Sequence, residues 1–378
     1  MSSQIVKILR VESVAPIPGA DKIETIVVGG WQCVVRVGTY KVDDLVTFVP
    51  DDYILPEDLA VRLGVKEYLG SGNRTKVVRL RKTPSYGVVF ANEHGLPEGT
   101  DVAERYGITK YVPPVRNSGG SNINCTRPAK NHPDFHKYTD IENIRHYKMA
   151  MANLEVVATI KYHGHNSRIG YIDGTLMCGS RNLPRVFPYK LVSPSWRDVL
   201  KNIWKYRLNY HRWLEKVPVD DPSGIATDGF WFPYSLHGVK AMLEAYKNRN
   251  IIIYGECYGG GIQSFDYGSP DQMLYRAFDI SIDGIYLDYD AFTRMCNEFG
   301  VPMVPTVYRG PFDFDRLVEL SRSKPPELCK HVNEGIVVKP IYEVRNPKLG
   351  RLILKIINDE YLLKKNEKPD AITDYTEE

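Results

Sequence analysis

The sequence has few cysteines, and they lack the spacing that would give them a structural role. Its 378 residues include six cysteines, and no two of them form a CxxC pair. This pattern argues against a zinc knuckle and against a disulfide-bonded scaffold, and it favours a reducing compartment. We therefore expect a cytoplasmic or nuclear protein, or a virus-encoded protein that acts inside a host cell.

Long hydrophobic runs and a strong net charge are also absent. No stretch approaches the roughly 18 apolar residues that a spanning helix needs, and the N-terminus lacks the apolar segment of a secretion signal. Lys and Arg total 49 against 46 Asp and Glu, which gives a formal net charge of +3. We therefore expect no membrane partner, and any nucleic acid must be held by a local basic patch.

Short strands dominate residues 1–112. Runs rich in β-branched residues, such as IETIVVGGWQCVVRVG and YGVVFA, are broken at turn spacing by glycine and proline. Few helical patterns separate them, so this region is predicted to form a small β-barrel domain.

A linker and a second domain follow. Residues 113–135 are poor in apolar residues and rich in Pro, Ser, Asn and Gly, which is typical of a linker. Residues 136–378 mix apolar strands with segments of helical periodicity at 195–217 and 237–250. The sequence therefore predicts an α+β protein of two domains.

The stretch EVVATIKYHGHN ends an apolar, β-branched strand in Lys161 and then places Gly164 close behind it. A lysine attacks only as the neutral amine, so enzymes activate it by burial and by neighbouring cations. A strand end beside a glycine, where a ligand can approach the backbone, suits that chemistry. A surface lysine before a turn is the alternative reading of this short motif taken alone.

Other motifs downstream also place charged residues at the edges of apolar strands. In chain order these are SRN, IIIYGE, AFDI, EGIVVKP and LKIIN, and they contain Arg181, Glu256, Phe278, Glu334, Lys339 and Lys355. In this order they resemble the motifs of the covalent nucleotidyltransferase superfamily of polynucleotide ligases and capping enzymes. The likeness spans residues 136 to 362, and its upstream end is the segment HKYTDIENI.

Within that superfamily the chain is similar to ATP-dependent, nick-sealing RNA ligases. The phage-type members carry KxHG with Asn two residues after the glycine, which here is Lys161, His163, Gly164 and Asn166. The resemblance implies a nucleotidyltransferase (ATP-grasp-like) ligase domain of antiparallel sheets and helices. It also implies that an RNA 5′-phosphate end is adenylylated and joined to a 3′-hydroxyl end, in a nicked duplex that contains RNA.

The resemblance assigns a role to each matching residue. Lys161 attacks the α-phosphorus of ATP to form lysyl-AMP, and Lys339 and Lys355 neutralise the α-phosphate. The remaining nucleotide-binding residues are Asn166, Arg181 for the nucleotide or the 5′-phosphate strand, Glu256 for the ribose, Phe278 for the adenine face, and Glu334. Electrostatics supply most of the catalysis in this kind of transfer.

A divalent metal ion, Mg²⁺ or Mn²⁺, is also implied. Magnesium keeps several waters and contacts few carboxylates directly, so Glu256 and Glu334 are expected to hold it through water. His163 stands where other relatives have Asp, which argues against a metal ligand at that position.

The fifth motif departs from the family pattern. RNA ligases usually read K-x-K there, whereas this chain has Lys355-Ile356-Ile357. Either Lys355 serves alone, or Arg351, Lys364 or Lys365 replaces the second lysine.

The N-terminal barrel resembles an OB-fold, which some nick-sealing RNA ligases carry before the catalytic domain. Its run RTKVVRLRK holds the basic residues predicted to bind nucleic acid, namely Arg74, Lys76, Arg79 and Arg81. A solvated strand face is the alternative for this run.

Two other functions stay open. An mRNA capping guanylyltransferase shares the lysine chemistry but uses GTP and places its OB domain after the catalytic domain. A non-catalytic RNA-binding protein with a degenerate nucleotidyltransferase fold needs none of the charged motif residues. We expect a monomer, because the chemistry requires no second subunit.

Overall fold

The computed structural model describes residues 6–112, 126, 128–187, 189–192, 215–218, 225–262, 265, 267–323 and 331–367. The predicted helix at 195–217 lies largely outside these residues. Its last part is a strand instead, β16 (Glu215–Pro218), which pairs with β15 (Tyr189–Val192). None of the described helices is long and apolar enough to span a membrane.

The N-terminal domain is built on a five-stranded antiparallel sheet. Its strand order is β3 (Trp31–Arg36), β2 (Ile23–Val28), β1 (Lys7–Pro16), β4 (Leu45–Val49) and β8 (Val88–Ala91). The short pairs are β5 (Tyr53–Ile54) with β9 (Thr109–Lys110) and β6 (Val78–Leu80) with β7 (Thr83–Ser85), and the α-helix is α1 (Glu57–Arg62). Alternating apolar residues fill the interior, as the sequence predicts for a small barrel.

Two sheets form the C-terminal domain. The one that we call sheet A has the order β10 (Glu142–Asn143), β24 (Leu354–Ile357), β21 (Gly335–Pro340), β11 (Glu155–Lys161) and β20 (Thr306–Pro311). Sheet B has the order β14 (Pro184–Arg185), β13 (Thr175–Gly179), β12 (His165–Ile172), β17 (Ile251–Gly259), β18 (Met273–Ile282) and β19 (Ile285–Tyr286). The pairings are antiparallel except that of β10 with β24, so sheet A is mixed.

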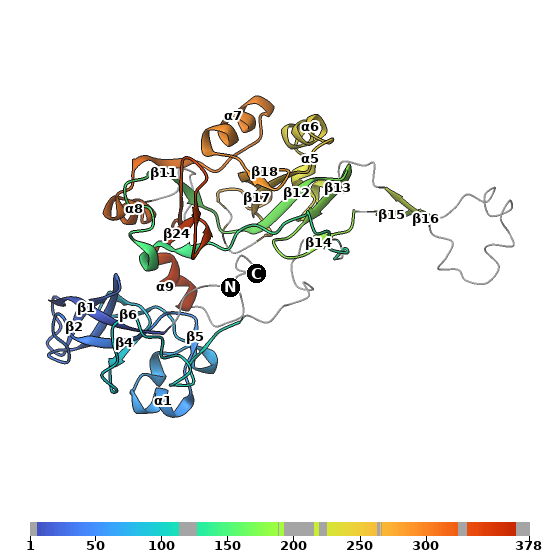
Figure 1. The fold of residues 1–378 in the computed structure, drawn as a ribbon. Helices are drawn as coiled ribbons and strands as arrows, with labels where there is room; N and C mark the ends of the chain where they lie inside the picture. Colours follow the sequence, from blue (N-terminus) through green and yellow to red (C-terminus); the bar gives the residue numbers. More distant parts are fainter. Residues whose placement is uncertain are drawn as a thin grey trace, which may run out of the picture.

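Helices cover the outer faces of the sheets (Figure 1). Sheet B packs against α5 (Phe232–Ser235), α6 (His237–Ala245) and α7 (Tyr289–Phe299) through a large apolar cluster. Sheet A packs against α8 (Phe314–Ser321). A smaller cluster that includes Tyr138, Ile252, Tyr254 and Ile353 lies between the sheets. The predicted helix at 237–250 is confirmed in its first part as α6, which ends at Ala245.

The last described helix, α9 (Asp359–Glu367), lies between the two domains (Figure 1). Leu363 on this helix is buried in the apolar cluster of the N-terminal barrel, together with Val11, Ile26 and Trp31. Two further contacts join the helix to the barrel: the Tyr86 hydroxyl donates to Asp359, and Arg79 pairs with Glu360 at 2.8 Å. The end of the sequence assigned to the catalytic domain thus packs on the first domain as well.

Candidate active site

Sheet A gathers three lysines on one face. Lys161 lies opposite Gly335, and Lys339 lies opposite Val157, in the pairing of β11 with β21. Lys355 lies opposite Val337 in the pairing of β21 with β24. Side chains alternate between the faces of a sheet, so all three lysines share the face opposite the α8 core. The strand register thus explains why charged residues sit in apolar strands.

Lys161 contacts a buried carboxylate. Its Nζ lies 2.5 Å from Oε1 of Glu334, and the side chains are 18% and 4% exposed. Glu334 directly precedes β21, and a Cβ on Gly335 would lie 2.1 Å from the carbonyl oxygen of Ile356. Glycine there lets β21 approach β24 closely, which places Glu334 beside the lysine.

The turn that follows Lys161 is enclosed by aromatic side chains. The Tyr162 ring lies 4.4 Å from that of Tyr258, and the backbone N–H of His163 donates to the Tyr267 hydroxyl at 2.6 Å. A Cβ on Gly164 would lie 2.1 Å from the carbonyl oxygen of Cys257. Glycine is therefore required for the chain to pass from sheet A into sheet B at this point.

Sheet B supplies a second carboxylate. Glu256 lies on the same face of β17 as Ile252 and Tyr254, which pack between the two sheets. Asn166 lies opposite Glu256 on one side, and Arg276 lies opposite it on the other. Among the described residues the buried Oδ1 of Asn166 has no hydrogen-bond partner. An oxygen of this kind next to a carboxylate fits a bound polar ligand or a hydrated metal ion.

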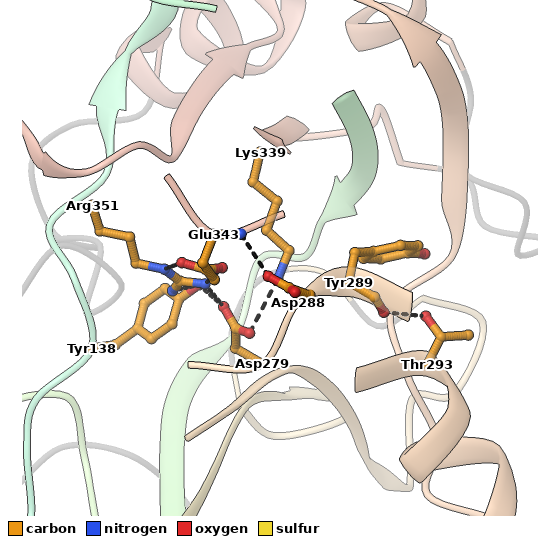
Figure 2. A network of polar contacts seen from close by, with 8 residues as sticks. All are labelled: Tyr138, Asp279, Asp288, Tyr289, Thr293, Lys339, Glu343 and Arg351. Carbon is orange, nitrogen blue, oxygen red and sulfur yellow. Dashed lines mark hydrogen bonds and ion pairs between the residues drawn. The ribbon is translucent and has the colours of Figure 1, made fainter. Parts of the chain in front are cut away.

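A buried polar network holds Lys339 (Figure 2). Lys339 Nζ donates to Asp279 at 3.1 Å, and Arg351 donates to the same carboxylate at 2.6 Å and to Glu343 at 2.5 Å. The Tyr138 hydroxyl also donates to Asp279, at 2.8 Å. Burial alone would raise the pKa of Asp279, but Lys339 and Arg351 outweigh it and hold that pKa below its usual value.

Comparison with family models decides the class of protein. The RNA ligase model matches residues 154–357, which is more than half of the chain. The chain belongs to the RNA ligase family. A model of an OB-fold domain matches residues 5–92. The predicted OB-like domain and the nucleotidyltransferase fold of the ligase domain are thereby confirmed.

Solved structures of an RNA ligase from Naegleria gruberi share this fold. One, of a mutant with ATP and Mn, has a TM-score of 0.68 at 20% identity and covers 97% of this chain and 100% of its own. Another, of a mutant with AMP and Mn, has a TM-score of 0.69 at 21% identity and covers 96% and 99%. A search of curated proteins gave no match.

Four of the nucleotide-binding residues predicted for this ligase lie together, and the others lie at separate places. Lys161, Glu334, Asn166 and Glu256 lie around the junction of β11, β12, β17 and β21. Phe278 packs edge-on against Tyr138, 4.8 Å between ring centroids. Arg181 lies instead on the loop after β13, where it pairs with Asp140. Lys339 is bound to Asp279, so it is engaged within the protein in this structure.

Arg351, one candidate for the second basic residue of the fifth motif, is engaged within the protein in this structure. Its guanidinium is 8% exposed and is bound to Asp279 and Glu343. The side chains of Lys364 and Lys365 lie outside the described residues. Lys355 is therefore the basic residue of this motif that the structure places on the lysine face of sheet A.

The predicted basic run in the OB domain is not one uniform strand face. Arg74 pairs with Asp52 at 2.5 Å and lies over the Tyr111 ring, and Arg79 pairs with Glu360 of α9. Arg81 follows β6 in the β6–β7 turn with a positive φ of 48°. Two of the four residues predicted to bind nucleic acid are therefore already engaged in ion pairs, and Lys76 precedes β6.

Several residues of the site were not predicted from the sequence. Asp279 and Tyr138 lie within two of the motif segments, but the resemblance assigns them no role, and no motif contains Arg276 or Tyr361. The strand register finds Arg276, because it lies opposite Glu256. His132 lies near Asp134 and Asp173 on the surface.

Proposed function

We propose that this RNA ligase is ATP-dependent and acts through a lysyl-AMP intermediate on Lys161. The observation that carries the proposal is the Lys161–Glu334 pair at 2.5 Å, on the sheet face that also holds Lys339 and Lys355. A buried carboxylate at that distance is placed to accept the proton that the lysine must lose before it attacks. The Naegleria gruberi ligase solved with ATP and Mn has this fold, which supports the choice of nucleotide.

In the first step Lys161 Nζ forms a bond to the α-phosphorus of ATP, and the bond to pyrophosphate breaks. Lys355, on the same face, offsets the negative charge that builds on the α-phosphate. Phe278 stacks on the adenine, and Glu256 accepts a hydrogen bond from the ribose. Lys339 serves the phosphate only when it exchanges its bond with Asp279, which Arg351 continues to hold.

The AMP then passes to an RNA 5′-phosphate, and the free lysine is restored. Attack of a 3′-hydroxyl on the activated 5′-phosphate joins the strands and releases AMP. We propose that the substrate is a nicked duplex containing RNA. The proposal rests on α9, which joins the OB domain to the ligase domain beside the turn that follows Lys161. Arg181, together with the OB domain, contacts the strands around the break.

A divalent ion, Mg²⁺ or Mn²⁺, fits the oxygen donors of this site. Glu256, Glu334 and the buried Oδ1 of Asn166 would hold it, partly through water. When bound, the ion neutralises phosphate charge and favours the uncharged amine of Lys161. The protein residues by themselves orient the nucleotide and exclude water from the lysine.

Labelled nucleotide tests the proposal. Purified protein is incubated with α-labelled ATP or GTP and magnesium, denatured, and examined for acid-labile label. We expect label from ATP in the wild type, none in Lys161→Ala, and full labelling in Lys240→Ala, whose lysine is exposed on α6. Label from GTP alone would indicate a capping enzyme, and no label would indicate a binding protein.

Sealing of defined nicks tests the substrate. Duplexes with a 5′-phosphate at the nick are compared with RNA or DNA on the 3′-hydroxyl side, and with the same ends unpaired. We expect sealing of the nick with an RNA 3′-hydroxyl end. Joining of unpaired ends at an equal rate would contradict the preference for nicked duplexes.

A further inference from the structure

Arg181 forms an ion pair that joins the two sheets of the ligase domain. Its Nη2 donates to Oδ1 of Asp140, and the arginine side chain is only 16% exposed. Arg181 lies on the loop after β13 of sheet B, whereas Asp140 lies two residues before β10 of sheet A. Within the described part of the chain this guanidinium has no other acceptor, so its remaining N–H groups face water or a ligand.

The strand register places Arg181 at the end of sheet B that carries the candidate active site. Gly179 lies opposite Arg168 in the antiparallel pairing of β12 with β13. Arg181 follows Gly179 by two residues, so it lies on the side of Asn166, which precedes Arg168 by two residues. Asn166 lies opposite Glu256 in turn. A phosphate held by Arg181 is thus next to the site described above.

A buried arginine fixes the backbone on both sides of this ion pair. Arg168 Nε donates to the carbonyl oxygen of Ser180 at 2.9 Å, and its Nη1 donates to that of Phe135 at 2.5 Å. Ser180 directly precedes Arg181, and Phe135 begins the segment that leads to Asp140. Arg168 therefore ties the two partners' segments to each other through the core of sheet B.

The segment of Asp140 is anchored a second time, next to the residue proposed to stack on adenine. Two residues before Asp140, the Tyr138 hydroxyl donates to the buried Asp279 at 2.8 Å, and the Tyr138 ring packs on Phe278. Lys137 adds a weaker contact, with its Nζ 3.7 Å from Oδ2 of Asp140. The carboxylate is therefore held in place on a rigid segment, and such a carboxylate sets the orientation of a guanidinium that it binds.

We propose that Asp140 is a positioning residue, which binds one side of the Arg181 guanidinium and directs its other N–H groups at the 5′-phosphate of the RNA end to be adenylylated. The inference rests on the proposed function, in which Arg181 contacts the strands around the break. A guanidinium is planar and carries five N–H donors, so a carboxylate on one nitrogen fixes the plane in which the others meet a phosphate. Asp140 acts through Arg181 and does not contact the substrate.

The variant Asp140→Asn tests this role, because asparagine keeps the shape of the side chain but not its charge. The assay starts from enzyme that already carries labelled lysyl-AMP and measures AMP transfer to the 5′-phosphate of a nicked duplex in a single turnover. We expect transfer to slow by about tenfold, as for one weakened charged hydrogen bond, and Asp140→Glu to restore part of the rate. Lysyl-AMP formation from ATP should be unchanged. A loss confined to lysyl-AMP formation would show that Arg181 serves the nucleotide, and the inference would be wrong.

A double-mutant comparison separates positioning from a merely structural role. In the background of Arg181→Ala, Asp140→Asn should cause no further loss of transfer, since no guanidinium is left to orient. A further loss of the same size would mean that Asp140 supports the fold instead. Faster transfer in Asp140→Asn would mean that the carboxylate competes with the phosphate, and it would also overturn the inference. Asp134→Asn, at an exposed carboxylate of the same segment, is the matched control and should behave like the wild type.

A binding measurement reports on the pair without catalysis. The wild type should bind a nicked duplex with a 5′-phosphate more tightly than the same duplex with a 5′-hydroxyl, and Asp140→Asn should lose most of that difference. If the wild type forms no lysyl-AMP, the proposed function fails, but this comparison still tests Asp140. An equal preference for the 5′-phosphate in both proteins would contradict the inference even in an active ligase.

Discussion

Tyr361 Oη and His163 Nδ1 lie 2.9 Å apart, which ties the C-terminal helix to the turn that follows Lys161. Both side chains are buried, 5% exposed each. Two residues beyond Tyr361, Leu363 is buried in the OB cluster. One helix therefore contacts the nucleophile's turn and the core of the other domain.

Tyr361→Phe should slow lysyl-AMP formation. The phenyl ring keeps its packing on His163 and Phe265 but loses the hydrogen bond that orients the imidazole. One such bond contributes about 0.5–1.5 kcal/mol, so we expect a decrease of up to about tenfold in single-turnover label transfer from ATP. Tyr342→Phe, at a 69% exposed ring, is the matched control. Equal rates in the two variants would show that the bond does not position the turn.

Asp279→Asn should destabilise the ligase domain. The fully buried carboxylate pairs with Lys339 and Arg351, and removing one member of a buried ionic network costs about 3–5 kcal/mol. The measurement is urea unfolding of the variant and the wild type. Asp283→Asn, which alters an exposed pair with Arg249, should change stability little.

The same variant has a defined pH dependence. The pKa of Asp279 is lowered in the folded protein, so its stabilisation is present above the unfolded pKa, about 3.9, and is lost as pH falls through the lower folded value. The stability difference between wild type and Asp279→Asn should therefore be constant near neutral pH and shrink only in acid. A difference that shrinks between pH 8 and 6 would contradict the network.

Phe278→Leu should weaken ATP binding. Leucine keeps apolar contact with Tyr138 but offers no ring to the adenine, and stacking on an aromatic side chain contributes about 1–3 kcal/mol per base. We expect the KM for ATP to rise about tenfold in lysyl-AMP formation, and Phe278→Tyr to restore most of it. If both variants match the wild type, the ring serves packing between the sheets alone.

Leu363→Ala should loosen the contact between α9 and the OB domain. The side chain is 4% exposed among the apolar residues of the barrel, and such truncations cost about 2–5 kcal/mol. Thermal unfolding measures the loss, and Val61→Ala at a 59% exposed position of α1 is the control. Slower lysyl-AMP formation in Leu363→Ala would show that the helix couples the domains to the nucleophile.

The sequence places Lys161 and Glu334 at the edges of apolar strands, because strand patterns are local, whereas the roles predicted for them come from the resemblance to RNA ligases. The sequence shows an apolar run that ends in Lys161 and a Glu–Gly pair that precedes a second apolar run. Antiparallel pairing of the two strands brings these residues together. The buried network around Lys339 could not be predicted from such local patterns. Its members come from β18 and from the segments around Tyr138 and Arg351, which only the packing of the two sheets brings together.

The role of α9 also required the structure. Its sequence, DEYLLKKNE, carries apolar residues that contact two different domains, and periodicity alone does not say which neighbour each one meets. The same holds for Asp140 and Arg181, which lie beside two different sheets. Contacts of this kind depend on long-range packing, which local patterns do not encode.

Asp51→Asn should stabilise the OB domain in a pH-dependent way. Burial, followed by the nearby charge of Asp52, raises the pKa of Asp51 to about 7, although the backbone N–H of Gly87 donates to it at 2.7 Å. A carboxyl group whose folded pKa is raised loses stability as pH rises from its unfolded value towards its folded value. Asparagine keeps an acceptor for Gly87 and cannot ionise. The gain in melting temperature over wild type should therefore grow from about pH 4 to about pH 7 and then level off. A gain that stays flat over this range would mean that the pKa of Asp51 is not raised.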